Sequence, residues 1–310
     1  MNPQHQRTFL TTAALLSLAA FLGGCAVANN AIRSDFTDFN NIIQYNQTQQ
    51  MLLNLVRMHF RESPMFLQAG SLTASYESHV GASLGASVES PGNTKTAEAG
   101  VSYSFSTKPT VSYIPVEGKN YVQQFLAEIS PDTFCLLLRS GWPVAELVDL
   151  LVERVTLPAG NSLVNNRTAA SDPEFRTFVT TLREAQQNGQ LSVISTNASF
   201  ALAIGTNITP LHLFQFRSLC DVMFAASKNT QTPPEQARRV KAGKANGVLD
   251  IRVSKSPLND SMVWIKYAGY YYSISHDDLR SKDMLALLMQ LYRIQAAPAG
   301  AAPILTIPAR

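Results

Sequence analysis

A two-residue alternation over residues 71–113 constrains the fold of this chain more than any other feature. From Leu72 to Val88 the even positions are mostly apolar, and the odd positions are mostly small or polar. Ser90-Pro91-Gly92-Asn93, which is typical of a turn, follows, and the alternation then resumes with the opposite parity. Because successive side chains of a strand point to opposite faces, this period predicts the two strands of a long β-hairpin.

The change of parity predicts one apolar and one polar face for the hairpin. Directly opposed residues of antiparallel strands share a face, and a turn centred between Gly92 and Asn93 would place Val88 opposite Ala97. The predicted apolar face then consists of Val80, Ala82, Leu84, Ala86, Val88, Ala97, Ala99, Val101, Tyr103 and Phe105. Serine and glycine dominate the other face, which suits contact with water.

The hairpin admits three interpretations. Nine uncharged residues separate His79 from Glu89, and nine separate Glu98 from Lys108, close to the ~9–11 residues of a membrane-spanning strand. A lone hairpin cannot cross lipid with unpaired edges, so insertion would require several copies that close a pore. The layout would be similar to that of the curli-exporter lipoprotein. The alternatives are a ribbon packed on the body or on another copy, and a flexible low-complexity loop.

The N-terminus predicts secretion and a lipid anchor. Arg7 precedes an apolar run over residues 9–21, which fits a secretory signal and is too short for a spanning helix. Leu22-Gly23-Gly24-Cys25 follows and resembles the lipobox of bacterial lipoproteins. The resemblance implies cleavage before Cys25 and acylation of its thiol. The alanine at the next position, Ala26, resembles the pattern of lipoproteins that are sorted to the outer membrane. The alternatives are an ordinary signal peptide and a chance cysteine.

The rest of the chain predicts an α+β fold. After a tether at 25–35 comes a long amphipathic helix within 36–68, followed by the hairpin at 69–114 and a mainly helical region at 115–230. Helices are expected over 119–129, 131–139, 143–155, 172–188 and about 209–226. Residues 247–310 predict a β-meander, a helix at 279–294 that Asp277 or Asp278 caps, and an edge strand at 304–307.

Composition and motifs favour a non-enzymatic role. The net charge is +3, which gives no indication of nucleic-acid binding. The histidines that would remain after cleavage are far apart, and neither metal-ligand spacing nor a nucleophile or phosphate-loop motif is present, so we expect no catalytic, metal or cofactor site. Cys135 and Cys220 are candidates for a disulfide or for buried free thiols. Tyr267-Ala268-Gly269-Tyr270-Tyr271-Tyr272 predicts strand packing, with a glycan-stacking surface as the alternative.

Several segments resemble a family of uncharacterised Gram-negative lipoproteins. They are Leu52-Leu53-Asn54-Leu55-Val56-Arg57, Ser63-Pro64-Met65-Phe66-Leu67, Lys108-Pro109-Thr110-Val111-Ser112-Tyr113-Ile114-Pro115, Ser140-Gly141-Trp142, Tyr267-Ala268-Gly269-Tyr270-Tyr271-Tyr272-Ser273-Ile274 and Ile304-Leu305-Thr306-Ile307-Pro308. The resemblance implies a shared fold and carries over no activity or functional residue.

Together these features predict a lipoprotein on the periplasmic side of the outer membrane, with a scaffolding, assembly or pore-forming role. The expected partners are the bilayer through acylated Cys25, further copies of the chain and other envelope proteins. A membrane-tethered periplasmic enzyme or glycan-binding module is the alternative.

Overall fold

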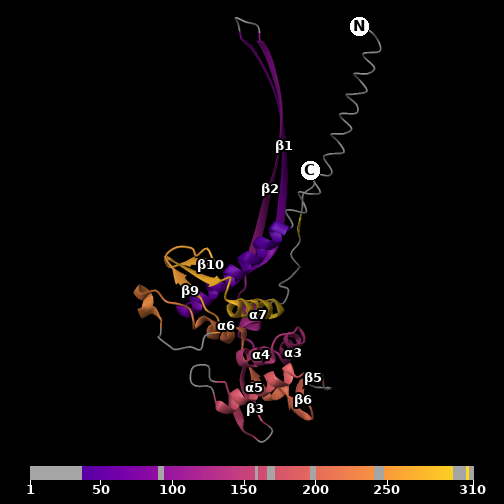
Figure 1. Cartoon of the computed structure of the whole chain (residues 1–310), viewed down its shortest axis with the longest axis vertical. Helices are drawn as coiled ribbons and strands as arrows, with labels where there is room; N and C mark the ends of the chain where they lie inside the picture. Colours follow the sequence, from indigo (N-terminus) through magenta and orange to yellow (C-terminus); the bar gives the residue numbers. More distant parts are fainter. Residues whose placement is uncertain are drawn as a thin grey trace, which may run out of the picture.

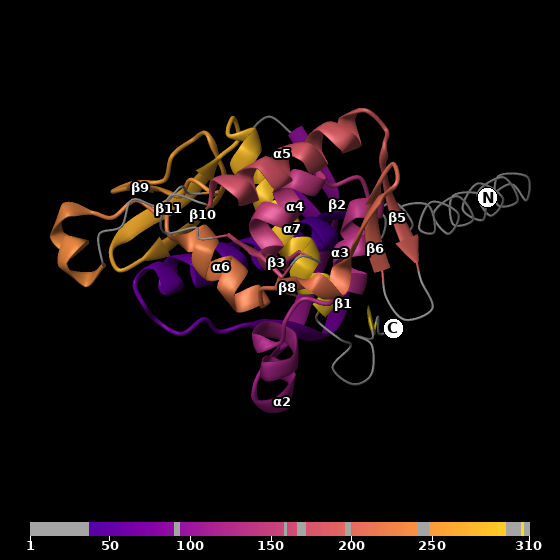
Figure 2. The ribbon, with the colours of Figure 1, turned by 90° about the horizontal axis from the view of Figure 1, so that it is seen from below.

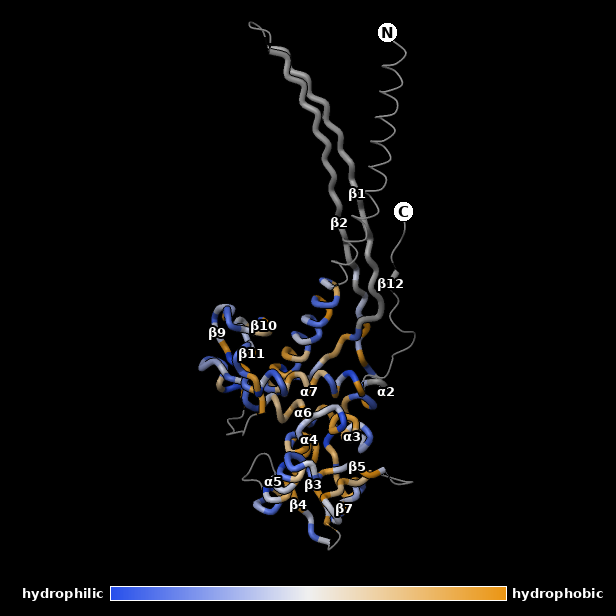
Figure 3. The backbone as a smooth tube through the Cα atoms, turned by 45° about the vertical axis from the view of Figure 1, so that its right-hand side comes forward, coloured by the Kyte–Doolittle hydropathy of each residue, from blue (hydrophilic) through white to orange (hydrophobic). Residues whose placement is uncertain are grey.

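The computed structural model describes residues 37–89, 94–157, 160–165, 172–195, 200–240, 248–295 and 305–306, and these form an α+β fold. The predicted lipobox residues Leu22, Gly23 and Gly24, the predicted acylation site Cys25 and the predicted tether lie outside the described residues. A helix occupies residues 37–59 and is called the long helix below. Hydrophilic and hydrophobic residues alternate along it (Figure 3).

The predicted hairpin is present and projects from a helical body (Figure 1). Strand β1 (Leu67–Glu89) pairs with the antiparallel strand β2 (Thr94–Pro115) over almost its whole length. At the usual rise of ~3.3 Å per residue each strand is about 70 Å long. The short strand β12 (Leu305–Thr306) adds a parallel partner to β1 at Leu72 and Thr73, near the body.

The observed register corrects the predicted one by two residues. Val88 pairs with Lys95 and Val80 with Tyr103, because the last pair, Glu89 with Thr94, encloses all four residues of the predicted turn. The centre of the observed pairing therefore lies one residue earlier in the sequence than predicted. A shift of two preserves parity, so the residues predicted on one face still share it.

The same shift displaces the two uncharged stretches relative to each other. They face each other only over residues 80–84 and 99–103, whereas the predicted register would have opposed residues 80–86 and 99–105. Glu77, Glu98 and Lys108 all occupy positions of the polar face. On the apolar face the first charge from the body outward is Lys95, opposite Val88 near the tip.

A bulge at Gly70 changes the parity of β1 close to the body. Ala69 pairs with Tyr113 and Ser71 with Ser112, so Gly70 is the extra residue. Leu67 therefore lies on the same face as the even-numbered residues beyond the bulge. Strand β2 has no extra residue, and Tyr113 continues the odd-numbered apolar series down to the body.

Contacts of Met65 and Phe66 attach the base of the hairpin to the body, and we call this base, residues 65–67 and 113–115, the root. The buried amide of Asn54 in the long helix donates to the Met65 carbonyl at 2.8 Å and accepts from the Met65 N–H at 3.0 Å. The buried Phe66 ring stacks on Phe125, with centroids 4.2 Å apart, and on Tyr292 at 5.2 Å. The exit direction of β1 is thus set by three separate elements.

The body places helices around one apolar core, with small sheets at its margins. Seen along the long axis, β9–β11 and β5–β6 lie on opposite sides of α4 and α7 (Figure 2). The helices are α2 (Gly118–Tyr121), the π-helix η1 (Val122–Leu126), α3 (Pro131–Arg139), α4 (Val144–Leu151), α5 (Pro173–Gln187), η2 (Leu211–Leu213), α6 (Leu219–Ser227), η3 (Pro234–Arg239) and α7 (Leu279–Gln295). The sheets have the orders β4 (Ser162–Val164)–β3 (Val152–Thr156)–β8 (Phe214–Phe216), β5 (Leu191–Ser195)–β6 (Phe200–Ile204)–β7 (Asn207–Pro210) and β10 (Ser261–Tyr267)–β11 (Tyr270–Ser275)–β9 (Arg252–Ser254).

Three predictions for the body were wrong. The helix expected over 143–155 ends at Leu151 and continues as β3, in which Val152 and Val155 pair with β8. The helix expected from Thr209 starts only after Ser218, whose side chain forms a capping box with Asp221. The C-terminal strands are not a meander, because β9 pairs with β11 rather than with β10.

Removal of the Asn54 amide should loosen the root. We expect Asn54→Ala to lower the free energy of unfolding by about 2 kcal/mol, because it leaves a backbone donor and an acceptor of Met65 unpaired. Asn40→Ala, on the exposed start of the same helix, should change it by less than ~0.5 kcal/mol. Urea unfolding of both variants measures the difference, and equal effects would contradict this role of Asn54.

Candidate functional site at the root of the hairpin

A cleft of about 470 Å³ opens where the long helix, the root and strand β10 meet. We call it the root cleft. Figures 1 and 3 show the long helix beginning beside the lower part of the hairpin. The lining residues are Ile43, Asn46, Gln47, Gln49, Gln50, Leu53 and Arg57 from the helix, Met65, Leu67 and Tyr113 from the root, and Trp264, Ile265 and Lys266 from β10.

The lining combines apolar side chains with amides and two cations. All three structural elements contribute apolar groups, and the four helix amides lie along one wall. Arg57 and Lys266 provide positive charge, and no aspartate or glutamate occurs among the described lining residues. The root cleft therefore favours a ligand that is largely hydrocarbon and carries negative charge.

The walls of the root cleft are fixed by contacts behind them. Gln49 donates to the Trp264 carbonyl at 2.9 Å, which ties the long helix to the outer edge of the C-terminal sheet. The Trp264 ring meets Tyr271 edge-on with centroids 5.5 Å apart. The Lys266 ammonium lies 5.4 Å from the centre of the Tyr271 ring. This pre-arranged geometry lowers the entropy cost of binding a ligand.

The root cleft opens on the apolar face of the hairpin. Leu67 and Tyr113 line the cleft. The bulge at Gly70 puts Leu67 on the face that carries Val80 farther out, and Tyr113 lies on the same face as Tyr103 through the regular alternation of β2. The start of the long helix lies on this side of the hairpin as well, since Ile43 shares the cleft with Tyr113.

His59 joins the end of the long helix to the loop after α6. It is buried, and its Nε2 lies 2.7 Å from Thr232 Oγ1. Burial lowers the pKa of His59 below its ordinary value of 6.5, against the smaller opposing effect of a hydrogen bond with the Ser227 backbone. The imidazole is thus held in its neutral form as a structural link.

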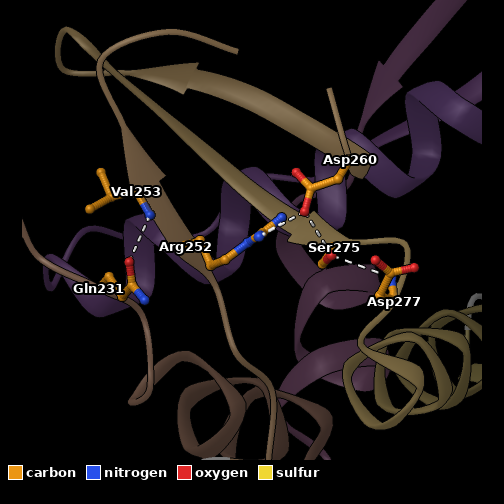
Figure 4. Close-up of polar contacts among 6 residues, drawn as sticks. All are labelled: Gln231, Arg252, Val253, Asp260, Ser275 and Asp277. Atoms are coloured by element: carbon orange, nitrogen blue, oxygen red, sulfur yellow. Dashed lines mark hydrogen bonds and ion pairs between the residues drawn. The ribbon is translucent and has the colours of Figure 1, made fainter. Parts of the chain in front are cut away.

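A polar cluster in the C-terminal sheet has a structural role (Figure 4). Arg252 forms an ion pair with Asp260 at 2.9 Å, and Ser275 donates to the same carboxylate oxygen at 3.1 Å. The hydrogen bond from Arg252 lowers the pKa of Asp260. Asp278 accepts from the N–H and the hydroxyl of Ser281 and so caps α7. Asp277 and Asp278 were the two candidates for this cap, and Asp278 is the residue that forms it.

The tyrosines of the C-terminal hairpin are mostly engaged within the protein. Tyr267 donates to Glu62, Tyr270 donates to Glu235 at 2.8 Å, and Tyr272 is fully buried. Ala268 and Gly269 form the turn between β10 and β11 with φ of +48° and +86°, as a type I′ turn requires.

Cys135 and Cys220 are both free thiols, so the disulfide that their sequence positions allowed is not formed. Burial raises the pKa of Cys135 to about 11 and also raises that of Cys220. Thiolate chemistry is therefore disfavoured at both positions.

Among the described residues no group of three or more His, Cys, Asp or Glu side chains is placed to hold a metal ion. The described helices include none that is long and apolar enough to cross a membrane.

The depressed pKa of His59 predicts a pH-dependent stability. The unfolded chain binds a proton more readily than the folded one, so stability is full above pH 6.5 and falls as the pH drops below it. The slope should approach at most about 1.4 kcal/mol per pH unit. Urea unfolding on both sides of pH 6.5 measures it. His59→Gln should show a shallower slope, and an unchanged slope would assign the pH dependence elsewhere.

Sequence reasoning missed the root cleft, because its lining comes from three segments that are distant in sequence. The row of amides at positions 46, 47, 49 and 50 was the one local signal.

Comparison of the chain with protein-family models, curated proteins and solved structures found no match. The site is therefore defined by its own geometry.

Proposed function

We propose that this chain is an outer-membrane-anchored lipoprotein with a non-enzymatic role, in which hairpins from several copies assemble into a pore or export channel. Acylated Cys25 anchors each copy, and the body faces the periplasm. The observation that carries the proposal is the pair of open edges along the outer part of the hairpin.

Both edges are blocked at the same level near the body. Strand β12 covers β1 at Leu72 and Thr73, and Pro109 of β2, which has no N–H to donate, pairs with the next residue, Ala74. Beyond this level each strand has only the other as a partner among the described residues. Isolated two-stranded ribbons are marginally stable, and open edges favour pairing with further strands.

Further copies of the same hairpin suit these edges. Under cyclic symmetry all hairpins point the same way, so β2 of one copy would run antiparallel to β1 of the next. The apolar face would then turn to lipid, and the serine- and glycine-rich face to the interior. Glu77, Glu98 and Lys108 would be exposed to water inside the assembly, because they occupy positions of the polar face.

Chain lengths are consistent with this arrangement. An extended chain from Cys25 to the start of the long helix at residue 37 reaches about 40 Å. The distance along the hairpin from Leu67 to Val80, where the uncharged stretch of β1 begins, is also about 40 Å. The acyl group and the uncharged part of the hairpin can therefore reach one membrane together, on the apolar side of the hairpin.

Shortening the hairpin in register should abolish assembly. Replacement of residues 78–105 by Asn-Gly would join Glu77 to Ser106, which pair directly, through a two-residue turn. We expect a monomer by native mass measurement and no conductance in planar bilayers, with unchanged helical circular dichroism from the body. Oligomers that survive this change would contradict assembly through the hairpin.

A positive charge on the apolar face should have a different effect from one on the polar face, even at neighbouring positions. Leu84 pairs with Ala99 on the apolar face, and Ser83 pairs with Gly100 on the polar face. Leu84→Arg should cost about 2–4 kcal/mol per copy in lipid and prevent stable insertion. Ser83→Arg should permit insertion and shift ion selectivity towards anions. Conductance and reversal potentials distinguish the two, and equal tolerance of both substitutions would exclude a lipid-facing apolar side.

A further inference from the structure

We infer that the root cleft binds an anionic amphiphile, with its hydrocarbon chain against the apolar lining and its acidic headgroup at Arg57 and Lys266. The ligand class follows from the cleft itself. It does not depend on whether hairpins assemble, so the site can be tested on a monomeric chain.

The root cleft exposes more hydrocarbon than its position in the fold requires. Met65 is 49 % exposed, Tyr113 45 % and Leu67 36 %, although all three belong to the root, where the neighbouring Phe66 is buried. Partly buried Leu53 and the Trp264 ring continue this surface on the other walls. A contiguous apolar surface of this kind marks a binding site more often than chance exposure. Its volume of about 470 Å³ lies within the ~300–1,000 Å³ typical of small-molecule sites.

The charge of the lining selects an acidic headgroup. Arg57 projects from the long helix and Lys266 from β10, so positive charge comes from two walls of the same cleft. The Arg57 guanidinium contacts the Asn54 amide oxygen at 3.4 Å, and Lys266 lies near the Tyr271 ring. Neither contact neutralises a cation, and the described lining contributes no carboxylate. A carboxylate or phosphate would add charge-assisted hydrogen bonds there.

The apolar face of the hairpin gives the amphiphile a path into the root cleft. Leu67 and Tyr113 belong both to the cleft and to that face, which carries no charged residue from the root out to Ala86 and Ala97. A hydrocarbon chain could enter along the hairpin from a membrane at its far end, or directly from solution. The two sources share one chemistry, a hydrocarbon chain with an anionic headgroup, and differ only in whether a membrane supplies it.

The two tryptophans of the chain provide a direct reporter and its matched control. Trp264 lines the cleft, whereas the Trp142 indole N–H donates to Gln290 at 2.8 Å and lies outside the lining. In the full chain with Trp142→Phe, bromine-labelled dodecanoate should quench Trp264 fluorescence saturably. With Trp264→Phe instead, the remaining Trp142 should stay unquenched. Absence of quenching in the first variant, or equal quenching in both, would overturn the proposal.

Charge reversal tests the headgroup site. Lys266→Glu should weaken dodecanoate binding about tenfold and leave binding of uncharged dodecanol within about twofold. Lys255→Glu introduces the same change at an exposed position outside the cleft lining and should leave both affinities unaltered. Circular dichroism verifies that each variant folds. Equal effects of the two substitutions, or a neutral dodecyl glycoside bound as tightly as dodecanoate, would contradict an anionic amphiphile as the ligand.

Vesicles identify the source of the ligand. If the membrane supplies it, vesicles with bromine-labelled anionic phospholipid should quench Trp264 more than vesicles with the zwitterionic analogue, and Lys266→Glu should remove the difference. If the ligand is a free acid, dodecanoate alone should quench. Absence of dodecanoate quenching would overturn the site whichever source is correct, and a monomeric chain that still binds dodecanoate would count only against the proposed assembly.

Discussion

The contacts that attach the root of the hairpin to the body are the interaction on which the rest of the structure depends. Because the hairpin is about 70 Å long, a small change of angle at its base moves its tip by a large distance. The few residues at the base therefore decide its direction. Asn54 pairs with both backbone groups of Met65, and Phe66 stacks on Phe125 of η1 and on Tyr292 of α7, whose rings also contact each other at 5.8 Å. These contacts bring together the long helix, the first helical turns after the hairpin and the last helix of the body.

Local periodicity predicted the hairpin well because its strands pair with each other and with little else. The faces followed from parity alone, whereas the register depended on how many turn residues the last pair encloses. The bulge at Gly70 also left a readable signal, since Leu67 and Leu72 have opposite parity with a glycine between them. The root cleft was not predicted, because its walls come from three segments that are distant in sequence.

Predictions in the body failed where tertiary pairing overrode local pattern. Val152 and Val155 are spaced like helix residues, yet β-branched side chains also suit a strand, and pairing with β8 decided between the two. Phe214-Gln215-Phe216 alternates as a strand does, and Ser218 with Asp221 marks the later helix start. The partner of β12 could not be predicted, because Leu305 lies more than 230 positions after its partner Leu72.

The bulge connects the body with the hairpin. Without the extra residue, Leu67 would share a face with the serine and glycine positions of β1, and the apolar side of the root would face away from that of the ribbon. With it, the apolar face, the root cleft and the start of the long helix all lie on one side. A lipid anchor that precedes this helix would therefore emerge on the side that lipid or an amphiphile would contact, and the opposite side would remain free for water.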